Sequence, residues 1–188
     1  MLELYEMTKC RPVSTPTFQN VVYSKAQCPK NDAELKAMKE IPYLQALGSL
    51  IYLATCTRRD ISYAVSELSK YASNTGETHW EGIKRVMMYL RGTSSFGISY
   101  GHTPTAANLV GYADASYARC VDTRSSRYGG IYLLNGGPVE WKSKLTPTVA
   151  LSSMEAEYIG ASKFARIEVW LRRSFDEVGF PQAEAIPL

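Results

Sequence analysis

The stretch Leu151-Ser152-Ser153-Met154-Glu155-Ala156-Glu157-Tyr158 opens a helical pattern that continues to about residue 178. Ser152 and Glu155 have the spacing of a capping box, in which each side chain bonds a backbone N–H at the helix start. Glu157 has no such capping role. Steps of three and four residues from Glu157 give a mostly apolar stripe: Ala161, Phe164, Glu168, Leu171, Phe175 and Val178. We therefore predict that Glu157 points toward a sheet, where a carboxylate needs a partner or a metal ion.

A second acid stands at the end of an apolar strand pattern over residues 108–113, where Asp114 follows directly. Taken alone, an Asp at this place is more typical of a turn start. Glu157, likewise, could simply stabilise the positive end of its helix. The arrival of both acids at one sheet favours the alternative, which is a metal-ion site.

The rest of the chain divides into three regions. Residues 1–42 are rich in proline and predict an irregular lead-in with one short helix at 32–39. Residues 43–92 have helical spacing, with Asp60 as one expected N-cap and Thr78 as another. Residues 93–188 change to strands, expected at 96–100, 108–113, 128–134 and 139–144, followed by the long helix. The fold class is therefore α/β, with a helical region before a sheet.

Composition sets broad limits on function. The 188-residue chain is 45% hydrophobic and carries a net charge of +3, which permits a nucleic-acid partner without requiring one. Its apolar runs are too short to span a bilayer, and no signal peptide is expected. The four cysteines lack zinc-ligand spacing and predict free thiols in an intracellular compartment, the cytoplasm or nucleus.

A series of motifs recurs in a fixed order along almost the whole chain. They occupy residues 9–16, 48–53, 57–65, 79–81, 85–93, 111–115, 141–144, 149–158 and 169–173. In this combination the chain resembles the Pol polyprotein of copia-type LTR retrotransposons. The resemblance matches residues 43–92 to the connection that follows the reverse transcriptase. It matches residues 93–188 to the first part of the ribonuclease H domain, whose mixed sheet carries helices on its faces.

The resemblance implies a specific chemistry, namely hydrolysis of the RNA strand of an RNA–DNA hybrid. Asp114 and Glu157 match catalytic carboxylates that hold two Mg²⁺ ions, with Mn²⁺ as a possible substitute. Candidate contacts to phosphate are cationic side chains that could equally be ordinary solvated charges: Lys142, Lys144, Arg124 and Arg127.

The chain also departs from the family pattern. Arg59 stands where the family usually has proline, and Ser116, Tyr117 and the pair Arg119-Cys120 replace residues that commonly follow the first catalytic Asp. In the family a strand beyond residue 188 supplies the third catalytic Asp, and a fourth comes later. We therefore expect the chain to be inactive by itself.

Two alternatives remain open. One is a non-catalytic module that binds nucleic acid or protein, completed by other polyprotein segments or by a partner strand at its sheet edge. The other is an active hydrolase that uses the carboxylates of Asp114, Glu157 and Asp122.

Overall fold

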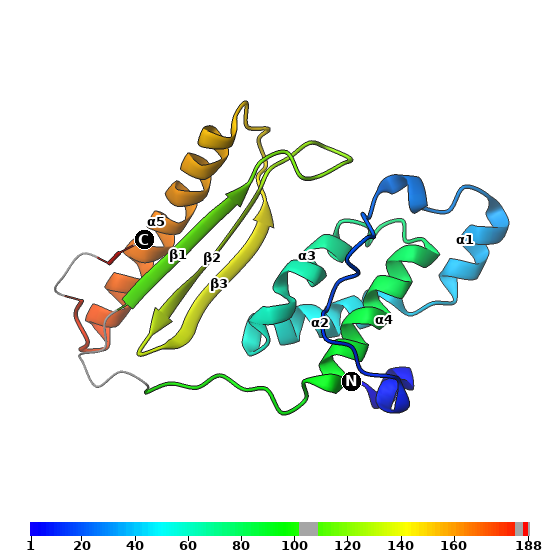
Figure 1. Cartoon of the computed structure of the whole chain (residues 1–188), viewed down its shortest axis with the longest axis horizontal. Helices are drawn as coiled ribbons and strands as arrows, with labels where there is room; N and C mark the ends of the chain where they lie inside the picture. Colours follow the sequence, from blue (N-terminus) through cyan, green and yellow to red (C-terminus); the bar gives the residue numbers. More distant parts are fainter. Residues whose placement is uncertain (102–108, 183–185, 188) are drawn as a thin grey trace. The chain divides into compact units, whose positions relative to one another are not determined.

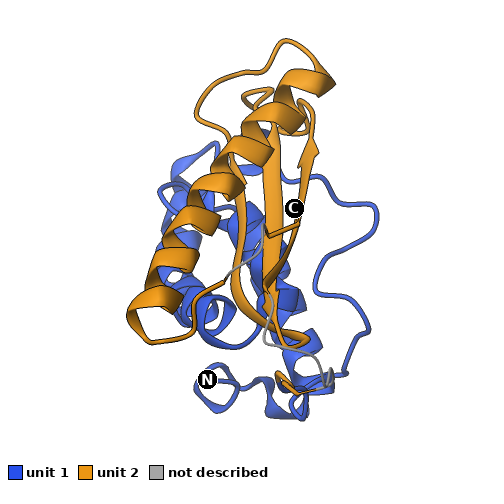
Figure 2. Ribbon diagram, turned by 90° about the vertical axis from the view of Figure 1, so that its left-hand side faces the viewer, with its two compact units in different colours: residues 1–97 blue, residues 98–188 orange. Residues whose placement is uncertain are grey.

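The computed structural model describes residues 1–101, 109–182 and 186–187. They form two compact units, Met1–Gly97 and Ile98–Leu188, coloured separately in Figure 2. Within the described residues, the first unit holds four α-helices, and the second holds a three-stranded antiparallel sheet with one long helix (Figure 1). The predicted α/β class, with a helical region before a sheet, is therefore confirmed.

The first unit is built from four α-helices and four short 3-10 turns, three of which precede the first α-helix. The α-helices are α1 (Asp32–Lys39), α2 (Tyr43–Cys56), α3 (Ser62–Ser69) and α4 (Glu77–Gly92). The 3-10 turns are η1 (Glu3–Tyr5), η2 (Met7–Lys9), η3 (Lys25–Gln27) and η4 (Arg59–Ile61). Apolar residues three and four apart on α2, α3 and α4 face inward, and this spacing is what gives each helix its buried side. The fully buried side chains of this core include Leu50, Ile61, Leu68, Ile83 and Met87.

Two expected helix starts differ in the structure. Thr78 is not an N-cap, because α4 begins at Glu77 after Gly76. The cap there is His79, whose Nδ1 accepts the Gly76 N–H at 3.0 Å while its ring stacks on Tyr71 with 4.0 Å between centroids. A buried imidazole thus takes the capping role expected of the Thr78 side chain.

Asp60 is likewise not an N-cap. It lies in η4, and its carboxylate accepts hydrogen bonds from Arg58 Nη2 at 2.7 Å and from the Tyr89 hydroxyl at 2.8 Å. The same guanidinium donates to the Thr93 carbonyl at 3.1 Å. Burial by itself would raise the pKa of Asp60, but the hydrogen bonds from Arg58 and Tyr89 outweigh it and hold that pKa below its ordinary value. This network ties η4 to the end of α4.

The second unit has strands β1 (Leu109–Ser116), β2 (Arg127–Leu134) and β3 (Gly137–Leu145), in the order β1-β2-β3. The β2–β3 turn has positive φ at Asn135 and Gly136, 51° and 79°, which is the backbone of a tight hairpin. The strand expected at 96–100 is absent. That segment is held by side-chain and turn contacts instead, with the Tyr100 hydroxyl donating to the Pro138 carbonyl at 2.9 Å.

The long helix α5 (Ser153–Glu177) covers one face of this sheet and contacts β1 and β2 (Figure 1). Tyr132, fully buried, donates its hydroxyl to the Phe164 carbonyl at 2.9 Å. Beside it, Gly130 leaves room for the Phe164 ring, because a Cβ there would lie 2.5 Å from the ring and 2.5 Å from the Tyr112 carbonyl. The helix can lie this close only where the strand has no side chain.

We predict that Gly130→Ala lowers the free energy of unfolding of the second unit by about 1–3 kcal/mol, since the new methyl group meets both Phe164 and backbone. The matched control is the adjacent Gly129→Ala, whose Cβ would meet nothing closer than the Lys142 carbonyl at 3.5 Å. Denaturant unfolding of both variants measures the difference. Equal losses in the two would contradict the close helix–strand contact.

A second prediction concerns pH. Because the pKa of Asp60 is depressed in the folded chain, its stabilising effect is complete above the ordinary value of 3.8 and is lost as the pH falls through the folded pKa. Asp60→Asn should therefore lower stability by about 1–3 kcal/mol at neutral pH, and the difference from wild type should shrink in acid.

Urea unfolding from neutral to acidic pH measures this effect, with exposed Glu40→Gln as the control from the same unit. A difference between wild type and Asp60→Asn that stayed constant down to acidic pH would be inconsistent with the ion pair.

Candidate functional site

The start of α5 is capped as the sequence predicts. The Ser152 Oγ accepts the Glu155 N–H at 3.1 Å, and the Glu155 carboxylate accepts the Leu151 N–H at 2.6 Å. Glu155 is therefore occupied with capping, which leaves Glu157 as the acid of this first turn without a capping role.

Glu157 does not lie in the buried stripe of the helix. The buried residues of α5 are Ala156, Gly160, Phe164 and Leu171, whereas Glu157 and Ala161 are exposed. The prediction of the buried stripe is thus wrong at the helix start, where the buried positions are shifted by one residue. The small residues Ala156 and Gly160 are buried there because they let the helix approach the strands. Glu157 stands at the border of this stripe rather than within it.

Asp114 lies inside β1, opposite Gly129 of β2, rather than at the end of the strand. Its neighbour Ala115 faces α5, since an added Cβ on Gly160 would lie 3.4 Å from the Ala115 Cβ. Side chains alternate along a strand, so Asp114 projects from the other face of the sheet, where it is exposed.

The backbones that carry the two acids are nevertheless adjacent. Gly160 comes one helical turn after Glu157, and its added Cβ would lie 3.9 Å from the Asp114 carbonyl oxygen. The separation of the two carboxylates, expected at roughly 4–8 Å for a shared metal pair, stays a prediction.

A cluster of three acids is not present in the part of the chain that the structure describes. No group of three or more His, Cys, Asp or Glu residues there could hold a metal ion. Asp122 therefore does not complete a three-carboxylate site with Asp114 and Glu157, and the alternative hydrolase built on those three residues is wrong.

The four candidate phosphate contacts have different surroundings. Arg127 is only 6% exposed and donates to Ser143 Oγ at 3.2 Å, so its guanidinium is part of the sheet rather than of a surface. Arg124 is exposed in the β1–β2 loop at a φ of 56°. Lys142 and Lys144 lie on β3, on the face that α5 covers, and Lys142 pairs with Glu140 at 3.0 Å.

Sequence reasoning missed the residues that face these two lysines. Lys163, Arg166 and Trp170 of α5 line the same hollow as Lys142 and Lys144. The sequence did contain a signal for this group of residues. Their spacing of three and four residues places them along one side of a helix.

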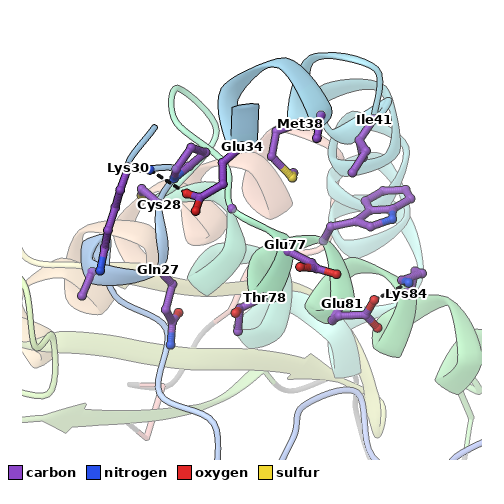
Figure 3. Close-up of a pocket in the computed structure, with 15 residues that line it drawn as sticks. Gln27, Cys28, Lys30, Glu34, Met38, Ile41, Glu77, Thr78, Glu81 and Lys84 are labelled. Atoms are coloured by element: carbon purple, nitrogen blue, oxygen red, sulfur yellow. Dashed lines mark hydrogen bonds and ion pairs between the residues drawn. The ribbon is translucent and has the colours of Figure 1, made fainter. Parts of the chain in front are cut away.

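A second hollow, in the first unit, was also missed. It has a volume of about 530 Å³ and lies between α1 and the start of α4 (Figure 3). Met38, Ile41 and Trp80 give it an apolar side. Two of its acidic groups have partners nearby: Glu34 accepts the Lys30 backbone N–H at 2.8 Å, and Glu81 pairs with Lys84. No chemistry follows from this arrangement.

Comparison with known proteins identifies relatives over most of the chain. It is 40% identical over 186 residues to the retrovirus-related Pol polyprotein from transposon TNT 1-94 of Nicotiana tabacum, covering 99% of this chain and 14% of that polyprotein. It is 35% identical over 183 residues to the corresponding polyprotein from transposon RE2 of Arabidopsis thaliana, covering 95% of this chain and 12% of that polyprotein. No family model and no solved structure matches the chain.

A shorter relative matches over nearly its full length. The chain is 46% identical over 134 residues to secreted RxLR effector protein 161 of Plasmopara viticola, which is 71% of this chain and 94% of that protein. The chain is therefore homologous to a short part of retrovirus-related Pol polyproteins from plant copia-type transposons. It spans about one seventh of the tobacco polyprotein, 14% of its length.

The helices themselves show no membrane-spanning candidate. Within the described residues, no helix is both long enough and apolar enough to cross a bilayer.

We predict that Ser152→Ala lowers stability by about 0.5–2 kcal/mol, because the Glu155 N–H loses its acceptor. Glu155→Gln should cost little, since the amide oxygen can still accept the Leu151 N–H. Thermal unfolding of the two variants measures both effects. A much larger loss in Glu155→Gln than in Ser152→Ala would show that Glu155 does more than cap the helix.

Proposed function

We propose that the chain is the part of a retrotransposon Pol polyprotein that joins the reverse transcriptase to ribonuclease H. Residues 43–92 would be the connection, and residues 93–188 the beginning of a ribonuclease H-like domain. Its activity in the polyprotein would be cleavage of the RNA strand of RNA–DNA hybrids, inside the cell. The observation that supports this proposal is the close approach of α5 to β1, where a Cβ added at Gly160 would lie 3.9 Å from the Asp114 carbonyl oxygen.

The end of the described chain supports the same architecture. The Gly111 N–H, on the edge of β1 away from β2, donates to the Pro187 carbonyl at 2.9 Å, and Ile186 is buried in the core between helix and sheet. The Gln182 side chain accepts the Leu109 N–H at 3.1 Å, so the chain advances along β1 in the direction of that strand. A strand continuing from here would run parallel to β1 and pass beside Asp114.

The oxygen ligands that Asp114 and Glu157 offer meet only part of what a hard divalent cation needs. Asp114 and Glu157 offer carboxylate oxygens, which Mg²⁺ and Mn²⁺ prefer. In two-metal hydrolysis the ions activate water and stabilise the leaving oxygen, and they need several anionic ligands. The described residues contain no cluster of three such groups, and under this proposal a neighbouring strand would supply a further carboxylate. Asp114 and Glu157 would then be two of the residues that hold the ions.

The incomplete acid cluster also favours a second candidate, a non-catalytic module that binds another protein. Three apolar side chains at the start of α5 are largely exposed: Leu151, Met154 and Tyr158. Exposed apolar groups beside a sheet edge are typical of surfaces that another segment covers. Such a module would bind its partner without divalent ions, whereas the nuclease requires them.

A cleavage assay separates these two functions. The substrate is a labelled RNA–DNA hybrid with Mg²⁺ or Mn²⁺, and the proteins are this chain and a chimaera that adds the following stretch of the tobacco polyprotein. We expect no efficient cleavage by the chain and clear cleavage by the chimaera, because the added strand supplies further carboxylates.

Asp114→Asn in the chimaera is the matched control, since it removes one ligand without changing size. It should abolish cleavage while leaving the fold intact by circular dichroism. Cleavage that survives Asp114→Asn would remove Asp114 from the site, and an inactive chimaera that is folded would favour the binding module.

A further inference from the structure

The face of the second unit between β3 and α5 carries a concentration of positive charge. A hollow of about 450 Å³ lies there, within the size range of ligand sites, roughly 300–1,000 Å³. Four cationic side chains and one carboxylate line it: Lys142, Lys144, Lys163, Arg166 and Glu140. The lining therefore carries an excess of three positive charges.

The cations come from two rigid elements that face each other. Lys142 and Lys144 alternate on β3 and so project from the same face of the sheet, opposite Gly130 and Tyr128 in the register. Lys163 and Arg166 are three residues apart on α5, which places them on one side of that helix. Within the lining of the hollow, Lys142 pairs with Glu140 at 3.0 Å, and that single carboxylate cannot neutralise four cations.

An aromatic side chain lies at the end of this row of charges. Trp170 lines the hollow one turn beyond Arg166 and is 59% exposed, although it is a large apolar group. Proteins that bind single-stranded nucleic acid combine an exposed aromatic ring with several cations. The phosphates pair with the cations, and a base stacks on the ring. An acidic peptide would use the charges but would gain little from the indole.

The hollow is separate from the candidate acid pair. Lys163 and Trp170 follow Glu157 by six and thirteen residues, which is roughly 9 and 20 Å along the helix axis. β3 is two strands from β1, or about 10 Å across the sheet. The positive groups therefore neither belong to the carboxylate site nor depend on divalent ions.

We propose that this hollow, lined by Lys142, Lys144, Lys163, Arg166 and Trp170, binds a single strand of nucleic acid through its phosphates and one stacked base. The proposal concerns binding alone and holds whether or not the protein cleaves hybrids.

The test is fluorescence anisotropy of a short, labelled, single-stranded oligonucleotide of mixed sequence, titrated with the full chain in EDTA at several salt concentrations. The variant Lys163→Gln/Arg166→Gln should weaken binding about ten-fold or more at low salt. It should also reduce the steepness of log K against log salt by about 1.4, since two phosphate contacts are lost. The matched control is Lys36→Gln/Lys39→Gln, which removes the same charge from exposed positions of α1 and should change little.

Trp170 gives a second, independent readout. Trp170→Ala should weaken binding about 5- to 150-fold, the range for loss of one stacked base, while Trp170→Phe retains most of the affinity. Both Trp170 variants keep the net charge, so their effect cannot come from long-range electrostatics. Thermal unfolding confirms that each variant is folded.

Two outcomes would overturn the proposal. Equal losses in the α5 and α1 double variants would show that the attraction is only general charge. Competition by polyglutamate as strong as by unlabelled oligonucleotide, together with unchanged binding by Trp170→Ala, would assign the hollow to acidic protein segments. Because EDTA removes divalent ions, binding in this assay and failure of the cleavage assay remain distinguishable.

Discussion

Close contact between α5 and the strands is the constraint on which the second unit depends. Gly130 on β2 and Gly160 on α5 are the two places where a side chain is missing, and each is filled by the opposite element: the Phe164 ring at Gly130 and the Cβ atoms of Ala115 and Tyr128 at Gly160. Dense packing of this kind tolerates little added volume. The helix is therefore fixed in both rotation and height above the sheet.

The fixed rotation of α5 decides where its polar side chains lie. With Gly160 and Phe164 against the strands, Glu157 is placed at the border near β1, and Lys163, Arg166 and Trp170 line the hollow beside β3. A shift of the helix by one residue would turn all of these side chains to other directions, because neighbouring residues differ by about 100° around the axis. One packing contact thus keeps an acidic region and a basic region apart on the same helix.

Sequence patterns predicted the elements of this unit better than their orientation. The cap at Ser152, the β2–β3 hairpin and the extent of α5 were all readable, because each depends on residues close in sequence. The buried face of α5 was misjudged, since Ala156 and Gly160 are weak hydrophobic signals and their importance comes from the small space above β1 and β2.

In the first unit, too, the sequence predicted a helix correctly but not the partners of its polar groups. Helix α1 lies where expected, at Asp32–Lys39, but the caps at Asp60 and Thr78 do not exist. Asp60 instead bonds Arg58 and Tyr89, and the latter is distant in sequence. At the start of α4, the buried imidazole of His79 accepts the N–H of the N-cap residue, Gly76. Local motifs cannot reveal a partner that only the folded chain brings near.

The separation of charge along α5 also has a consequence for nucleic-acid binding. Asp114 and Glu157 repel a phosphate backbone when no cation lies between them, whereas the basic hollow attracts it. The hollow begins roughly 9 Å from Glu157 along the helix, and this distance is close to the screening length of about 8 Å at physiological salt. The two regions therefore act on a bound strand largely as independent sites, so that attraction in the hollow can hold a strand while the acids remain unoccupied.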